Sequence, residues 1–261
     1  MRQFSAEYLE ATRAGMWADS RSALEPLALA SRQRILDVGA GTGKLTAVLR
    51  AETPGEVVAC DADPRLLSPL PRPVVQADAT RLPVVAGSVD LVVCQALLVN
   101  LPDPDSAIRE FARVSSDLVA AIEPDNGEVS LTSTVDAEAP LARRARERYL
   151  AGVATDATLG SVAARYREAG LTDVAVRRYD HVRTVEPPYD EQDLEAARRK
   201  ASGEGLAVDR EQILAGGASK AEYEALREDW REMGRAVVAQ MEAGEYRQRE
   251  VVPFYVTVGR V

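Results

Sequence analysis

Three acidic residues of this 261-residue chain stand where a carboxylate can do chemistry. Asp37, Asp61 and Glu123 each lie at or just after the end of a short apolar run of the kind that forms a buried strand. In an open α/β sheet, ligands bind outside the carboxyl ends of the strands, so these side chains are predicted to face one crevice. A carboxylate there can bind an amine or a cation, accept hydrogen bonds from two hydroxyls, or take up a proton.

A glycine-rich segment follows the first of these carboxylates. Glycines occupy positions 39, 41 and 43, and residues 44–51 then have the periodicity of a helix. Glycine lacks a Cβ, so it allows positive φ angles and a close approach of the backbone to a ligand. The spacing G-x-G-x-G fits neither the G-x-G-x-x-G loop of dinucleotide-binding proteins nor a phosphate-binding P-loop, in which Ser or Thr stands where this chain has Leu45. We therefore predict a cofactor loop that does not cradle a phosphate.

The segment from Asp37 to Gly43 resembles motif I of the class I S-adenosylmethionine-dependent methyltransferases, whose E/D-x-G-x-G-x-G pattern it meets. Over roughly residues 30–125 the chain is similar to the type 11 methyltransferases and the ubiquinone/menaquinone-biosynthesis methyltransferases. This resemblance implies S-adenosyl-L-methionine as the methyl donor and S-adenosyl-L-homocysteine as the product. The cofactor contacts that it implies are Asp37, Gly39, Ala40, Gly41, Gly43, Asp61, Ala62, Asp78, Ala79, Gln95 and Ala96.

Several of these contacts have an alternative role. Asp61 is the candidate for the ribose, because a carboxylate about 20 positions after the loop can accept hydrogen bonds from both ribose hydroxyls. Asp63 is the alternative, although its place before a proline suits a helix cap. The resemblance places Asp78 at the adenine and Gln95 beside the methionine part of the cofactor. Asp78 can instead be a turn residue, and Asp37 can cap a helix.

Apolar runs that alternate with helical patterns predict an α/β fold. We expect a Rossmann-like, doubly wound sheet of seven strands, mostly parallel with the last strand antiparallel, and a helical insertion between strands six and seven. The predicted strands are 35–38, 56–60, 73–76, 88–95, 118–122, 174–178 and 251–258. Helices outside the insertion are expected over 44–51, 105–113, 140–150 and 159–169.

The predicted organisation has four parts, namely an N-terminal helical segment over the cleft (1–30), the S-adenosylmethionine-binding core (31–184), the helical insertion (185–248) and the final strand of the core sheet (249–261). The insertion is expected to contain helices over 189–201, 209–215 and 219–243. The last begins with a capping box formed by Ser219 and Glu222 and has one apolar face. Because that face must be buried, the insertion is predicted to be a substrate lid or a dimer contact.

The acceptor site is less defined than the cofactor site. The catalytic residue is unknown, and Glu123, His181 and Tyr8 are the candidates for a base. The residues expected in the substrate cleft are Trp17, Arg13, Asn100 and Glu123. Trp17 can instead pack on the core, Glu123 can be a buried acceptor of backbone N–H groups, and His181 can be an ordinary surface or core residue.

The composition limits the classes of partner. The formal net charge of −9, from 41 acidic and 32 basic residues, repels polyanions, so nucleic acid is not an expected partner. Acid excess with so few lysines is typical of a salt-adapted proteome or a GC-rich genome. Cys60, Cys94 and the single histidine have no metal-site spacing. Without an apolar signal core or a run of roughly 20 apolar residues, we expect a soluble, cytoplasmic monomer or homodimer with no membrane span.

These features together predict an enzyme that transfers a methyl group by in-line displacement to a small-molecule acceptor. The alternatives are a non-catalytic S-adenosylmethionine-binding module and a methyltransferase acting on RNA or protein. A nicotinamide-dependent oxidoreductase would need the G-x-G-x-x-G loop. The segment 186–189 (EPPY) resembles the D/N-P-P-Y motif of amino-methylating nucleic-acid enzymes, but it follows strand six and not strand four, so we interpret it as the start of a helix.

Overall fold

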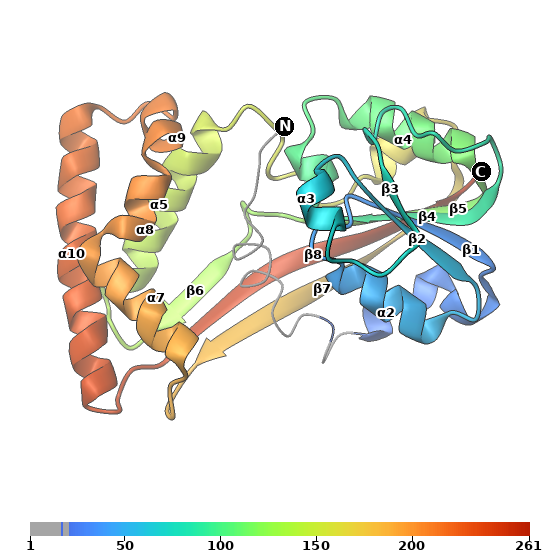
Figure 1. The fold of residues 1–261 in the computed structure, drawn as a ribbon. Helices are drawn as coiled ribbons and strands as arrows, with labels where there is room; N and C mark the ends of the chain where they lie inside the picture. Colours follow the sequence, from blue (N-terminus) through green and yellow to red (C-terminus); the bar gives the residue numbers. More distant parts are fainter. Residues whose placement is uncertain (1–16, 18–20) are drawn as a thin grey trace. The chain divides into compact units, whose positions relative to one another are not determined.

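The computed structural model describes Trp17 and residues 21–261, and the chain divides into two compact units (Figure 1). The first unit comprises Met1–Asp125, Leu159–Tyr179 and Phe254–Val261, and the second comprises Asn126–Thr158 and Asp180–Pro253. Two long strands, β7 (Thr172–Val185) and β8 (Gln248–Arg260), contribute residues to both units.

The first unit is built on a parallel sheet. Its strands are β1 (Arg34–Val38), β2 (Glu56–Asp61), β3 (Val74–Gln76), β4 (Val89–Gln95) and β5 (Ser115–Pro124). They lie in the order β3-β2-β1-β4-β5 and all pair in parallel, whereas β8 pairs with β5 antiparallel. This order puts the carboxyl ends of β1 and β4 side by side. The predicted α/β fold, mostly parallel with an antiparallel last strand, is confirmed.

The strand sequences explain why the sheet is covered on both faces. The run Leu91–Cys94 in β4 and the run Val119–Ile122 in β5 are completely buried, as continuous apolar strands are when helices cover both sides. The helices of this unit are α2 (Lys44–Glu52), α3 (Pro64–Leu67), α4 (Pro104–Val114) and α6 (Ala163–Glu168), with the 3₁₀ turns η1 (Arg21–Leu27), η2 (Leu29–Ser31) and η3 (Leu98–Asn100). The loops that follow the carboxyl ends of these parallel strands lie along one edge of the sheet.

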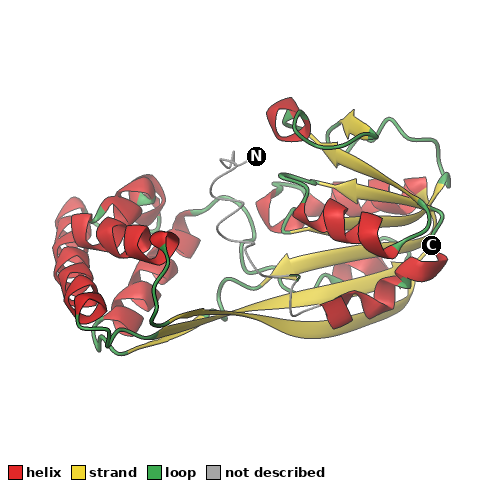
Figure 2. Cartoon of the chain, turned by 60° about the horizontal axis from the view of Figure 1, so that its bottom comes forward, coloured by secondary structure: helices red, strands yellow, loops and turns green. Residues whose placement is uncertain are grey.

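The second unit consists mainly of helices, which Figure 2 shows as one group. They are α5 (Glu138–Gly152), α7 (Glu191–Ser202), α8 (Glu204–Val208), α9 (Arg210–Ala215) and α10 (Lys220–Glu242), accompanied by the short strand β6 (Ser130–Ser133). The predicted start of the long helix is confirmed, because the Ser219 side chain accepts from the N–H of Glu222 and the Glu222 side chain accepts from the N–H of Ser219. The buried side chains of α10, including Tyr223, Met233 and Val237, pack inside this unit.

Glycines allow these helices to approach closely. A Cβ on Gly152 of α5 would lie 1.8 Å from the carbonyl oxygen of Gln212, and a Cβ on Gly216 would lie 1.8 Å from that of Arg148. Gly234 of α10 plays the same part against α7, because its Cβ would lie 2.3 Å from the nitrogen of Ala201. Larger residues at these positions would force the helices apart.

Two sequence expectations need correction. Residues 126–158, predicted within the core at 31–184, belong with the helices of 185–248, because α5 packs on α9 and α10. The sheet has eight strands and not seven, because β6 pairs antiparallel with the start of β8. Among the residues that the structure describes, no helix is both long and apolar enough to cross a membrane.

Candidate functional site

The glycine loop follows β1 and is hydrogen-bonded to the end of β2. Gly39, Gly41 and Gly43 have φ angles of 73°, 55° and 78°, which confirms the predicted need for glycine. The N–H groups of Gly39 and Ala40 donate to the carbonyl oxygen of Cys60 at 2.8 and 2.9 Å, and that of Gly43 donates to Ala40 at 2.9 Å. These loop amides are therefore bonded within the protein.

Asp61 binds the remaining glycine of this loop. Its Oδ2 accepts from the N–H of Gly41 at 2.9 Å, and its Oδ1 accepts from the N–H of Asp63 at 2.9 Å. Asp63 itself caps α3, accepting from the N–H of Arg65 at 2.9 Å, and its ion pair with Arg65 keeps the pKa of Asp63 below its usual value. Of the two carboxylates, Asp61 is the one that lies on the glycine loop.

Asp37 is buried at the end of β1 and binds the helix that follows the loop. Its Oδ2 accepts from the hydroxyl of Thr46 at 2.6 Å. The cap position of α2 is Gly43, which makes no side-chain cap bond. The bond to Thr46 fixes the Asp37 carboxylate beside the loop.

Asp78 follows β3 and has the structure of a turn residue. Its Oδ1 accepts from the N–H of Thr80 at 2.8 Å and from its hydroxyl at 2.7 Å, and these bonds lower the pKa of Asp78. The bonds engage only one of the two carboxylate oxygens. Ala79 is buried beside it, and Ala62, at the end of β2, is half-buried.

The end of β4 makes a strained turn. Gln95 is buried, and Ala96 has a φ of 47°, in the left-handed region that costs a residue with a Cβ about 1 kcal/mol or more. Two bonds hold Ala96, since its N–H donates to Ile122 at 2.9 Å and its carbonyl accepts from the amide of Asn100 at 2.9 Å. Asn100, expected in the substrate cleft, thus stabilises the turn.

Glu123 completes this turn from the end of β5. Its carboxylate is 0% exposed and accepts three consecutive backbone N–H groups, those of Leu97 (3.1 Å), Leu98 (3.0 Å) and Val99 (3.2 Å). Burial raises the pKa of Glu123 to about 7, against the opposing effect of these bonds. Of the two roles left open by the sequence, the structure shows the buried acceptor of backbone N–H groups.

The other acceptor-site candidates are placed as follows. Trp17 is buried and stacks on Tyr179 with 6.5 Å between ring centroids, which is the core packing that the sequence left open. Tyr8 and Arg13 lie outside the described residues. His181 is buried in β7 within the second unit, and burial together with the charge of Arg183 lowers its pKa, so the imidazole is neutral at pH 7.

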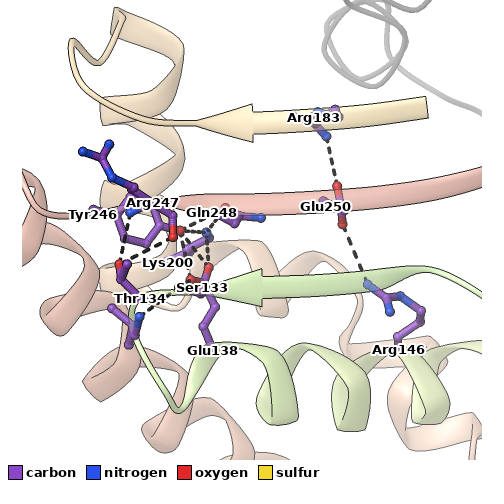
Figure 3. A network of polar contacts seen from close by, with 11 residues as sticks. Ser133, Thr134, Glu138, Arg146, Arg183, Lys200, Tyr246, Arg247, Gln248 and Glu250 are labelled. Carbon is purple, nitrogen blue, oxygen red and sulfur yellow. Dashed lines mark hydrogen bonds and ion pairs between the residues drawn. The ribbon is translucent and has the colours of Figure 1, made fainter. Parts of the chain in front are cut away.

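A second cluster of polar side chains lies in the second unit (Figure 3). Glu138, 1% exposed, accepts from Lys200 Nζ at 2.5 Å, the Tyr246 hydroxyl at 2.9 Å and the Ser133 hydroxyl at 2.5 Å. Gln248 Oε1 lies 3.2 Å from Lys200 Nζ and 2.9 Å from the Tyr246 hydroxyl. Burial and the charge of Glu138 raise the pKa of Tyr246, which keeps its proton. This cluster joins helices α5 and α7 to the segment before β8.

The model of a family described as a methyltransferase domain matches residues 36–117. The chain is also 43% identical over 98 residues to uncharacterised methyltransferases of Mycobacterium tuberculosis and Mycobacterium bovis. Over residues 36–117 the chain is therefore similar to the methyltransferase domain of this family. The matched region is 35% of this chain and 39% of those relatives, so the chain spans about two fifths of the length of the curated relatives that it matches.

Solved structures share the fold of the methyltransferase domain. A Bacillus halodurans protein named as a methyltransferase has a TM-score of 0.52 and 15% identity, with 93% of this chain and 98% of that chain covered. The Haemonchus contortus phosphoethanolamine N-methyltransferase 2, in complex with phosphomonomethylethanolamine and S-adenosylhomocysteine, has a TM-score of 0.50 and 16% identity, with 97% of this chain and 58% of that chain covered. At such identities the likeness shows the fold alone.

The structure also adds residues that the sequence did not indicate. Thr46 binds Asp37 from the first turn of α2, and the backbone of 97–99 binds Glu123. The position of Glu123 at the end of a strand was the sequence feature that could have indicated its contact with the backbone of 97–99. The described residues contain no group of three or more His, Cys, Asp or Glu that could hold a metal ion.

Proposed function

We propose that the chain is an S-adenosylmethionine-dependent methyltransferase that transfers a methyl group by in-line displacement to a small-molecule acceptor. The observation that carries this proposal is the bond between Asp61 and the N–H of Gly41 at the centre of the glycine loop. A phosphate-binding loop presents free N–H groups to an anion. Here the N–H groups of Gly39, Ala40, Gly41 and Gly43 already donate to acceptors of the chain.

The carboxylates at this loop select the charge of the ligand. Asp37 and Asp61 flank the glycines, so a phosphate placed among them would meet two like charges. A nucleoside with free ribose hydroxyls and a cationic side chain meets acceptors instead. S-adenosylmethionine has both features, and the residues therefore fit this cofactor better than a nucleotide.

Each part of the cofactor has a proposed partner. Asp61 would accept from the ribose hydroxyls with lone pairs that its two backbone bonds leave available. Asp78 and Ala79 would adjoin the adenine, and Gln95 and Ala96 the methionine part. When bound, the sulfonium supplies an electrophilic methyl group, so the protein chiefly aligns the acceptor and excludes water, which contributes roughly 7 to 11 kcal/mol to such reactions.

The acceptor side is proposed to use the remaining predicted residues. Residues 185–248 would act as a substrate lid or a dimer contact, and Arg13 would adjoin the acceptor. A neutral amine acceptor needs no base, and for a phenol or enol His181 would be the candidate base. The Haemonchus enzyme, bound to S-adenosylhomocysteine and a small phosphorylated amine, supports a small-molecule acceptor.

Isothermal titration calorimetry with S-adenosylhomocysteine tests this proposal. Wild-type protein should bind, and Asp61→Ala should weaken binding by about 1.5 to 3 kcal/mol, the range for a hydrogen bond to a charged group. Asp63→Ala is the matched control, since it removes the cap of α3 but leaves the loop bond, and its affinity should be unchanged. Absence of heat and of thermal stabilisation at high ligand concentration would refute the proposal. Tight binding without methylation of any compound in a broad panel would identify a non-catalytic binding module.

A further inference from the structure

The buried carboxylate of Glu123 has no oxygen left uncommitted. Oε1 accepts from the N–H groups of Leu97 and Leu98, and Oε2 accepts from that of Val99. A side chain that is 0% exposed and bonded in this way is poorly placed to take a proton from a substrate. It is well placed to fix three consecutive residues of the backbone, which we call the 97–99 turn.

The 97–99 turn touches the glycine loop directly. A Cβ on Gly39 would lie 2.9 Å from Cδ1 of Leu97 and 3.2 Å from its Cβ and Cδ2. The Leu97 side chain therefore rests against the backbone of Gly39, where β1 and β4 lie side by side. Movement of the turn would remove this support from the first glycine of the loop.

We propose that Glu123 is a positioning residue, whose ionised carboxylate holds the 97–99 turn so that Leu97 supports Gly39, and that protonation of Glu123 weakens cofactor binding. The part of this inference that concerns the cofactor rests on the proposed function. The part that concerns the turn does not, because it involves only groups of the chain.

The chemistry of a carboxylic acid explains the direction of this effect. A protonated carboxyl turns one of its oxygens into an O–H donor, so it accepts the three N–H groups less well than a carboxylate does. Because the N–H bonds favour the ionised form, ionisation must in turn favour the ordered turn. Protonation should therefore loosen the turn.

The surroundings of Glu123 place this protonation near neutral pH. The groups that face it are the thiol of Cys94 in β4, 3.5 Å from Oε1, and the phenol of Tyr166 in α6. Burial raises the pKa of both, so both are uncharged at pH 7, and Asp37 of β1 interacts with Cys94. None of these groups is a cation, and burial therefore sets the pKa of Glu123 at about 7.

Calorimetric titration with S-adenosylhomocysteine between pH 6 and pH 8.5 tests the proposal. The wild-type dissociation constant should rise about tenfold as the pH falls from 8 to 6, the effect of weakening hydrogen bonds to a charged group. Glu123→Gln should bind about as weakly as the wild type at pH 6 and show no pH dependence. Glu110→Gln is the matched control, because Glu110 also accepts a backbone N–H, that of Leu82 at 2.7 Å. It should keep the wild-type profile.

Amide hydrogen exchange without ligand separates this inference from the proposed function. After correction for intrinsic rates, protection of the amides of Leu97, Leu98 and Val99 should fall below pH 7 in the wild type and be low at all pH values in Glu123→Gln. Should that variant fail to fold, Leu97→Ala serves in its place. It should weaken cofactor binding and flatten the pH dependence of binding, while the amides of 97–99 keep the pH dependence of their protection. Wild-type protein that fails to bind but shows pH-dependent protection would refute the proposed function and support the turn. Equal protection in both proteins, or the same pH profile of binding, would overturn the inference.

Discussion

Two buried glutamates, one in each unit, are stabilised by different chemistry. Glu138 pairs with the ammonium group of Lys200 and two hydroxyls, so a full positive charge balances its own. Glu123 accepts from backbone N–H groups and a thiol and faces the uncharged phenol of Tyr166, so partial charges must stabilise its carboxylate. Glu138 therefore joins its neighbours through a charge-balanced pair, whereas burial raises the pKa of Glu123 to about 7, so this carboxylate gains and loses its proton near neutral pH. Of the two, Glu123 lies beside the candidate cofactor loop.

The largest effect is expected from removing the charge-balanced carboxylate. Glu138→Ala leaves the ammonium group of Lys200, whose side chain is 21% exposed, without its partner, and the hydroxyl groups of Tyr246 and Ser133 lose theirs. Breaking a buried ion pair in this way costs about 3 to 5 kcal/mol. The free energy of unfolding from urea denaturation should fall by that amount.

Glu195→Ala is the control for this experiment. Glu195 also pairs with a cation, Arg198, but both side chains are exposed, so the change in unfolding free energy should stay within about 0.5 kcal/mol. A loss for Glu138→Ala no larger than that of the control would show that the cluster contributes no stability, and the contrast between the two glutamates would fail.

The second prediction concerns the pH dependence of stability at Glu123. Its pKa is about 7 in the folded chain and near 4.5 ordinarily, so between these values the folded state binds more protons than the unfolded state. The contribution of Glu123 to the free energy of unfolding is therefore present at low pH and is lost as the pH rises to about 7. A shift of about 2.5 units, 7 minus 4.5, corresponds to about 3 kcal/mol. Global stability and order of the 97–99 turn should thus change with pH in opposite directions.

Urea denaturation of the wild type and Glu123→Gln at pH 5 and pH 8 isolates this contribution. Other carboxylates titrate equally in both proteins, so the difference between their unfolding free energies reports Glu123. The wild type should lose about 2 to 3 kcal/mol relative to the variant between the two pH values. A constant difference, or a change of the opposite sign, would mean that the N–H bonds outweigh burial.

The parts of this site that depend on local pattern could be predicted from the sequence. The glycine spacing predicted the positive φ angles of the loop, and the predicted strand ends placed Asp37, Asp61 and Glu123 correctly. A strand end does not reveal what a carboxylate binds, because the partners of Glu123 come from residues 97–99, more than 20 positions away in the chain. The sequence therefore left both of its roles open.

Two elements of the fold lacked a local signal as well. The strand β6 has the sequence SLTS, and its partner residues lie in Gln248–Val251, so its formation depends on a distant segment. The strand β7 extends to Val185, well past the predicted end at Arg178, and most of its residues are exposed or half-buried. Without a buried face, no apolar alternation marks its length.

The smallest effect is expected at the strained residue before the 97–99 turn. Ala96→Gly removes the Cβ from a residue with a φ of 47°, and the relief of strain should exceed the extra flexibility of glycine in the unfolded chain by about 0.5 to 1 kcal/mol. Gly87→Ala is the reverse control, since Gly87 has a φ of 61° and a Cβ there meets no atom within 4 Å. It should lose a similar free energy of unfolding.

If the carboxylate of Glu123 holds Ala96 in its strained state, the gain from Ala96→Gly should shrink in the Glu123→Gln background, because a looser turn has already relaxed. An equal gain in both backgrounds would show that the strain arises from the end of β4 and not from the bonds to Glu123.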